Sequence, residues 1–142
     1  MRENERMTSP EAEAGSRAVL IVEDSANNAA TIEMALLGIP GVFMLFAASG
    51  QEALQILNQH GVTVQAIITD LNMPRMDGFE LIRRVREDGR TSSVRIIVVS
   101  ADTDPETPER VARMKVDAFF AKPFSPAQVR RTLEQLLDAT TP

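Results

Sequence analysis

Short, largely apolar segments that end in charged or hydroxyl side chains restrict the fold of this chain more than any other feature of its sequence. Four such segments are present: residues 18–22 before Glu23 and Asp24, residues 65–69 before Asp70, residues 95–99 before Ser100, and residues 118–121 before Lys122. Apolar runs of this length are typical of strands that are buried on both faces of a parallel sheet. Ligands bind beyond the carboxyl ends of the strands in such a sheet, so these polar groups should meet at one edge.

The polar groups at this edge form a set with a specific chemistry. Three carboxylates, one hydroxyl and one ammonium group are expected to converge there. Mg²⁺ prefers hard oxygen ligands, and phosphoryl transfer requires charges that neutralise the phosphoryl oxygens. The pattern therefore predicts a magnesium and phosphoryl site.

Helical patterns separate the strand segments and follow the last one. Apolar residues recur there at intervals of three and four, which is typical of amphipathic helices. The anchors are Ile32, Leu36 and Ile39; Ala53, Ile56 and Leu57; Phe79, Ile82 and Val85; and Val129, Leu133, Leu136 and Leu137. With a second strand at residues 42–47 and a further helix at about 105–115, the chain contains five β/α units. It predicts an α/β fold of the (βα)5 type, with a doubly wound five-stranded parallel sheet and helices on both faces.

Three capping signals agree with these helices. Ser49 followed by Glu52 is typical of a capping box, and Ser125 before Pro126 is typical of a cap with proline at the first helical position. Asp77 can cap the helix that contains Phe79. The local signals and the apolar spacing therefore predict the same helix starts.

The helix at about residues 105–115 has the weakest pattern. Pro105 and Pro108 lie near its start, and Val111 and Met114 are its only strong apolar anchors. A helix with so few anchors derives little stability from packing. We therefore expect this element to be marginally stable and able to move.

Composition and charge limit the protein class. Residues 1–16 are polar and predict a disordered tail before a single domain at residues 17–139. No apolar run approaches the roughly 18 residues that span a membrane, and the N-terminus lacks the apolar core of a signal peptide. The chain contains no cysteine, which excludes disulfides and thiol chemistry. We expect a cytoplasmic protein without membrane contact.

The distribution of charge gives no sign of nucleic-acid binding. The formal net charge is −5, whereas a protein that binds a phosphate backbone carries a basic patch. The one cluster of cations, Arg83, Arg84 and Arg86, is predicted to lie on a solvated helix face. Direct contact with nucleic acid is therefore not expected.

Four motifs in register resemble the receiver domain of bacterial response regulators, the CheY-like superfamily with its flavodoxin-like fold. The motifs are Val22-Glu23-Asp24, the stretch from Thr69 to Gly78 (TDLNMPRMDG), Val99-Ser100-Ala101 and Lys122-Pro123-Phe124. The resemblance covers about residues 18–137. Ser100 follows Asp70 by 30 residues and precedes Lys122 by 22, separations that also fit the family.

The resemblance implies a role for each residue of the site. It implies Asp70 as phosphoacceptor, Glu23, Asp24, Asp70 and the backbone carbonyl of Asn72 as Mg²⁺ ligands, Ser100 and Lys122 as partners of the phosphoryl group, and Phe119 as the aromatic switch residue. The phosphoryl group would come from a sensor histidine kinase or a histidine phosphotransfer protein. Such a protein is a signalling phosphoacceptor of a two-component or phosphorelay system, and catalyses only its own phosphotransfer and autodephosphorylation. The family also implies a cis peptide bond between Lys122 and Pro123.

The resemblance further implies how the signal leaves the site. Phosphorylation would draw Ser100 toward the phosphoryl group, and Phe119 would turn inward to fill the space. This would change contacts with a downstream protein over residues 105–137. A homodimer through the same surface stays open. Two residues differ from the commonest family pattern, because Ser100 stands for Thr and Phe119 for Tyr. Without a phenolic hydroxyl, the switch would act by packing alone.

Other functions were compared with this one. A pseudo-receiver, which acts as an interaction module without phosphorylation, would be expected to lack a member of the acidic, hydroxyl and lysine set. A dehalogenase-like phosphatase requires a second acid two residues after the nucleophile, where this chain has Asn72. The phosphorylation-dependent switch is the favoured hypothesis. The type of regulator, and whether the chain is full-length or excised from a larger protein, stay open.

Overall fold

Five parallel strands form one sheet in the order β2-β1-β3-β4-β5. The computed structural model describes residues 17–59, 61 and 63–140, so the tail predicted at residues 1–16 lies outside the described residues. The strands are β1 (Arg17–Val22), β2 (Val42–Ala47), β3 (Val64–Thr69), β4 (Arg95–Ser100) and β5 (Ala118–Ala121). Every neighbouring pair in the sheet is parallel, as the apolar runs predicted.

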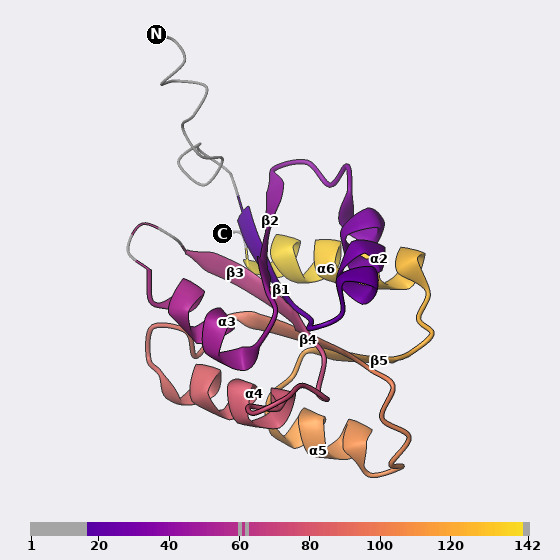
Figure 1. Cartoon of the computed structure of the whole chain (residues 1–142). Coiled ribbons are helices and arrows are strands. Elements are labelled where there is room, and N and C mark those ends of the chain that lie inside the picture. The colour runs from indigo at the N-terminus through magenta and orange to yellow at the C-terminus, as the bar shows by residue number, and fades with distance from the viewer. Residues whose placement is uncertain (1–16, 60, 62, 141–142) are drawn as a thin grey trace, which may run out of the picture.

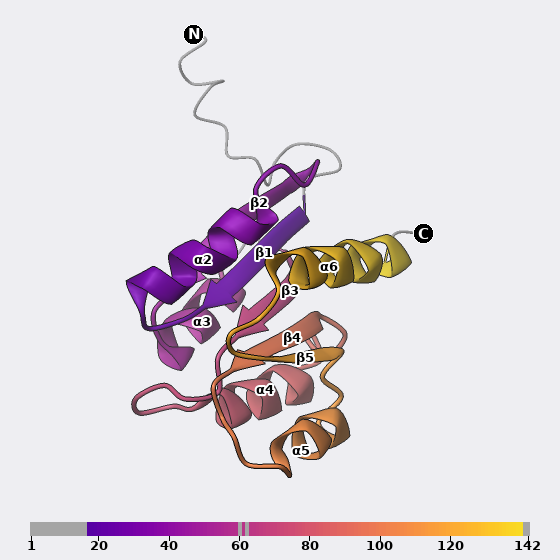
Figure 2. The ribbon, with the colours of Figure 1, turned by 90° about the vertical axis from the view of Figure 1, so that its right-hand side faces the viewer.

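Helices cover both faces of the sheet (Figures 1 and 2). They are α2 (Ala26–Leu36), α3 (Gly50–Leu57), α4 (Gly78–Glu87), α5 (Thr107–Arg113) and α6 (Pro126–Thr140). Helices α2 and α6 lie on one face, and α3, α4 and α5 lie on the other. The predicted (βα)5 fold is therefore confirmed.

Two apolar clusters hold the helices on the sheet. Successive side chains of a strand point to opposite faces, so each central strand contributes to both clusters. In β1, Leu20 and Val22 pack on the side of α3, α4 and α5, and Val19 and Ile21 pack on the side of α2 and α6. All four side chains are fully buried. The sheet is therefore covered by packed side chains on both faces.

The predicted helix caps are present. The Ser49 side chain accepts a hydrogen bond from Glu52 N–H (3.1 Å), and the Glu52 carboxylate accepts one from Ala48 N–H (2.7 Å). Asp77 and Ser125 accept in the same way at the starts of α4 and α6. These bonds satisfy N–H groups that have no partner within their helix.

Some predicted boundaries and environments were wrong. Helix α2 ends at Leu36 and is followed by Gly38 with φ of 87°, so Ile39 is buried in the turn rather than in the helix. Helix α5 is shorter than the predicted residues 105–115. Strand β5 is only partly buried, because it lies at the edge of the sheet and has β4 as its single neighbouring strand. The Lys122–Pro123 bond is cis, as expected.

Arg86 departs from the predicted solvated face. Its side chain is largely covered and donates hydrogen bonds to the carbonyls of Val94 (2.6 Å) and Lys115 (2.7 Å). Arg83 and Arg84 are about half-exposed, as expected. Among the described segments, no helix has both the length and the apolar character that crossing a membrane requires.

Candidate functional site

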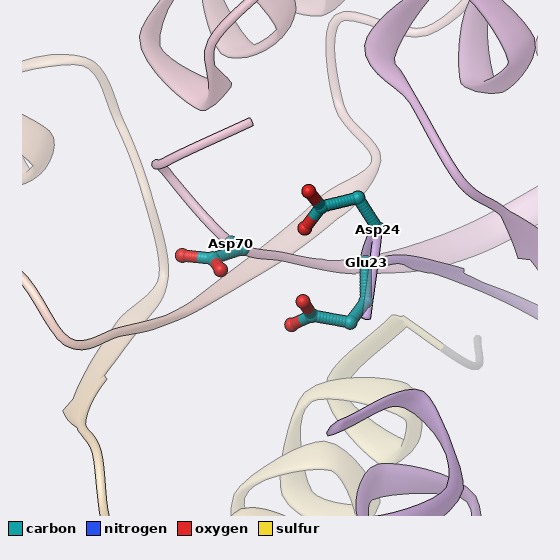
Figure 3. A group of neighbouring side chains, drawn as sticks. All are labelled: Glu23, Asp24 and Asp70. Atoms are coloured by element: carbon teal, nitrogen blue, oxygen red, sulfur yellow. The ribbon is translucent and has the colours of Figure 1, made fainter. Parts of the chain in front are cut away.

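Three carboxylates meet at the carboxyl edge of the sheet, and their oxygens face a common space (Figure 3). One oxygen from each of Glu23, Asp24 and Asp70 lies within 4.8 Å of the other two. Glu23 and Asp24 follow β1, and Asp70 follows the neighbouring strand β3. Parallel pairing therefore brings together residues that lie almost 50 positions apart in the chain.

Backbone contacts fix two of these residues. Asp70 N–H donates to the carbonyl of Val22 (3.2 Å), and Glu23 N–H donates to the carbonyl of Ala47 (3.0 Å). Glu23 and Asp70 are 5% and 8% exposed, whereas Asp24 is open to solvent. Two carboxylates of the cluster are therefore buried, and the third is exposed to solvent.

The two side-chain oxygens of Asp70 have different partners. Oδ1 accepts hydrogen bonds from the backbone N–H groups of Leu71 (2.6 Å) and Asn72 (3.3 Å). Oδ2 faces the Nζ of Lys122 at 3.2 Å. The backbone therefore holds one oxygen in place and leaves the other beside a cation.

Lys122 bridges the carboxylates. Its Nζ lies 3.1 Å from Glu23 Oε1 as well as 3.2 Å from Asp70 Oδ2. Burial alone would lower the pKa of Lys122, but the adjacent carboxylates of Glu23 and Asp70 outweigh burial and raise it above its ordinary value. Lys122 is therefore charged throughout the physiological range.

Glu23 has the opposite balance. Burial raises the pKa of its carboxyl group above the ordinary value, and the hydrogen bond from Lys122 offsets only part of this effect. The charge of Asp70 adds a smaller contribution in the same direction as burial. A cation that entered the space between the carboxylates would stabilise the ionised form of Glu23 and lower its pKa.

Ser100 and Phe119 lie outside the carboxylate cluster, on the paired strands β4 and β5. Ser100 is fully buried at the end of β4, where its Oγ accepts a hydrogen bond from Asp102 N–H (3.1 Å). Its carbonyl accepts from Lys122 N–H (2.8 Å), so the two residues are joined through the backbone. Phe119 in β5 is half-buried against the core on the side of α3, α4 and α5.

Sequence reasoning did not find the structural role of Gly78. A Cβ at this position would lie 2.7 Å from Leu71 Cα and would also collide with the carbonyl oxygen of Asp70. Gly78 N–H donates to the carbonyl of Leu71 (2.8 Å). The first turn of α4 therefore packs directly on the backbone that carries Asp70. The glycine directly after the Asp77 cap is the only sequence signal for this contact.

The fold and the site define a class of α/β protein with an acidic, lysine-containing site at the carboxyl edge of a parallel sheet. Residues 19–134 match the family described as the response regulator receiver domain. The chain belongs to this family of signalling phosphoacceptors and is a CheY-like receiver of two-component signalling.

Individual relatives agree with this assignment. The chemotaxis protein CheY1 of Helicobacter pylori is 30% identical over 119 residues, which are 84% of this chain and 95% of that protein. The crystal structure of a response regulator receiver protein from Pseudomonas putida is 31% identical with a TM-score of 0.76, covering 87% of this chain and 99% of that one. A putative response regulator from Chloroflexus aurantiacus is 30% identical with a TM-score of 0.78, covering 87% and 98%.

Proposed function

We propose that Asp70 accepts a phosphoryl group and that the chain is a phosphorylation-dependent switch. The phosphodonor would be a phosphohistidine on a sensor histidine kinase or a histidine phosphotransfer protein. The observation that carries the proposal is the cluster of three carboxylates within 4.8 Å, with the Lys122 ammonium on Asp70 Oδ2. Phosphoryl transfer depends on alignment and charge neutralisation, and this arrangement provides both.

Asp70 Oδ2 would be the attacking atom. It forms the new O–P bond while the P–N bond of the phosphohistidine breaks, and the imidazole nitrogen leaves with the electron pair and takes up a proton. Lys122 Nζ, 3.2 Å from Oδ2, is placed to neutralise the oxygens of the incoming phosphoryl group. The N–H groups of Leu71 and Asn72 hold the other oxygen, so the nucleophile has a fixed orientation.

The carboxylates fit a magnesium ion. Glu23, Asp24 and Asp70 offer hard oxygen ligands within 4.8 Å of one another, the donor type that Mg²⁺ selects. We expect the backbone carbonyl of Asn72 to complete the protein ligands. When bound, Mg²⁺ would supply positive charge to the phosphoryl oxygens in addition to that of Lys122. Glu23 would then gain a counter-charge for its buried carboxylate.

The output of the switch is proposed to pass through Ser100 and Phe119. The hydroxyl of Ser100 would leave the Asp102 N–H and turn toward the phosphoryl group, and Phe119 would repack in response. The affected surface, residues 105–137, contains the short helix α5, strand β5 and most of α6. A downstream protein, or a second copy of the chain, would recognise this surface.

Beryllofluoride, which mimics a phosphoryl group on a carboxylate, provides the test. The protein is titrated with beryllofluoride and Mg²⁺ while amide NMR shifts are followed, with Asp70→Asn as the control. We expect shifts around Asp70, Ser100, Lys122 and Phe119 that disappear in the control. A folded spectrum without any response would instead support a pseudo-receiver that acts unmodified.

A further inference from the structure

A groove of about 530 Å³ lies on the side of the sheet that α4 and α5 cover, next to the loop that follows Asp70. Four arginines line it: Arg75 from the loop, Arg83 and Arg84 from α4, and Arg110 from α5. The chain as a whole carries a formal charge of −5. Cations are therefore concentrated at one place on an acidic protein.

Two of the four arginines are already neutralised. Arg84 Nε lies 2.8 Å from Glu80 Oε2, and Arg83 contacts both Glu80 and Glu87 (2.7 Å). The other acid of the groove, Asp77, accepts the N–H of Glu80 as the cap of α4. The acidic groups of the groove are thus used within α4 itself.

Arg75 and Arg110 have no carboxylate partner among the residues that the structure describes. The guanidinium of Arg110 lies over the ring of Phe79, 3.6 Å from its centre, so its position is fixed by stacking. Arg75 is exposed and adopts a left-handed backbone with φ of 69°, a conformation that side chains other than glycine rarely populate. Strain of this kind is commonly retained where function requires it.

We infer that this groove binds an acidic segment of a partner protein, with Arg75 and Arg110 as the contacts for its carboxylates. The remaining lining includes Met76, Phe79 and Met114. Arginine, methionine and aromatic residues are the types enriched in protein–protein interfaces, and they suit a segment with both acidic and apolar side chains. A nucleic acid is disfavoured because the surrounding protein is acidic and would repel its backbone.

The inferred site adds a binding function to the proposed phosphoacceptor role. The groove is separate from the carboxylate cluster. However, residues 75–77, which line the groove, directly precede Gly78, and Gly78 packs against the backbone of Asp70. The groove shares α5 with the proposed output surface. A partner would therefore contact α4 and α5 together, and the α5 side of the groove belongs to the surface that phosphorylation is proposed to change.

The probe for this site is a short fluorescein-labelled peptide of alternating Glu and Leu pairs, together with the analogue in which Gln replaces every Glu. Binding to the full chain is measured by fluorescence anisotropy, and the contacts are mapped by amide NMR shifts. We expect saturable, salt-sensitive binding of the Glu peptide, weak binding of the Gln analogue, and shifts confined to residues 75–84 and 110–114.

Two double variants separate a built site from general attraction. Arg75→Gln/Arg110→Gln should weaken the Glu peptide about tenfold or more. Arg17→Gln/Arg90→Gln removes the same charge outside both the groove and residues 105–137, and should change affinity by less than about twofold. Thermal melts by circular dichroism establish that both variants are folded.

Three results would overturn the inference: no saturable binding, equal weakening in both double variants, or equal binding of the Gln analogue. All measurements are made without beryllofluoride. A protein that binds the peptide but does not respond to beryllofluoride would therefore refute the phosphoacceptor proposal alone. The converse result would refute the groove alone.

Discussion

Helix α6 on one face of the sheet and helix α5 on the other are anchored to very different extents. Helix α6 has 15 residues and buries Val129, Leu133 and Leu137 almost completely. Helix α5 has 7 residues, buries only Thr107 and Val111, and has no side-chain cap. One helix is fixed along its length, whereas the other depends on a single apolar anchor.

The difference extends to the surroundings of the two helices. The face with α2 and α6 packs apolar residues against the sheet, including Ile32 and Leu36. The opposite face carries the arginine-lined groove, and the loop that follows Asp70 joins it. Both faces nevertheless hold packed cores, so the short helix α5 is the element that can move without unfolding the domain.

Leu133→Ala should have the largest effect. Removal of a fully buried leucine side chain costs about 3 kcal/mol, in the range of about 2–5, because transfer and cavity terms add. Urea denaturation should show a lower midpoint with an unchanged slope. Leu136→Ala, at a half-buried position on the same helix, should cost about 1 kcal/mol or less. Equal losses in the two variants would contradict the description of α6 as anchored through one apolar stripe.

Val111→Ala tests whether α5 opens by itself. Loss of two methyl groups should cost about 1.5 kcal/mol, which corresponds to roughly tenfold faster hydrogen exchange of the α5 amides. Val129→Ala removes the same atoms from α6 and is the matched control. We expect faster exchange confined to α5 in the first variant and distributed over the core in the second. Identical exchange patterns would mean that α5 unfolds only with the whole domain.

The fold was predictable because its strands are short apolar runs with polar ends. Strand β2 was predicted with its observed bounds, and β1 and β3 each begin one residue earlier than predicted. Ile39 shows the limit of apolar spacing. Ile39 is spaced as if it belonged to α2, but the helix ends at Leu36 and Ile39 is buried in the following turn. Burial alone therefore does not show that a residue is helical.

The sequence predicted that the site residues converge, because parallel strands place their carboxyl ends at one edge of the sheet. It did not predict the contacts between helices and loops. The close approach of Gly78 to Asp70 depends on how α4 sits on the loop. The covering of Arg86 depends on carbonyls from two other segments. A helical period predicts which residues share a face and says nothing of what lies opposite them. The functional roles of all the site residues, from Asp70 to Phe119, stay predictions.

Asp24→Asn tests charge repulsion within the carboxylate cluster at the carboxyl edge of the sheet. Without divalent cations, three carboxylates within 4.8 Å repel one another, and an amide at the exposed position removes part of that repulsion without a burial cost. We expect the variant to gain about 1 kcal/mol of stability in EDTA, measured by thermal denaturation. Glu33→Gln, which removes an acid from α2, should change stability little. Clear destabilisation by Asp24→Asn would argue against a strained carboxylate cluster.

Glu80→Gln should have the smallest effect, because it disrupts only the exposed ion pairs of α4. Hydrogen bonds from Arg83 and then Arg84 lower the pKa of Glu80 to about 2, below its value of about 4.5 in the unfolded chain. The unfolded state therefore takes up the proton first as the pH falls. The contribution of Glu80 is present above about pH 4.5 and is lost as the pH falls toward 2.

At neutral pH and low salt, we expect Glu80→Gln to lower Tm by about 2 °C, and 1 M salt should abolish the difference because exposed pairs are screened. Glu106→Gln removes an exposed acid that has no ion pair among the described residues and is the control for charge alone. A loss comparable to that of Leu133→Ala would contradict this ranking, because exposed ion pairs would then stabilise the protein as much as a fully buried leucine side chain.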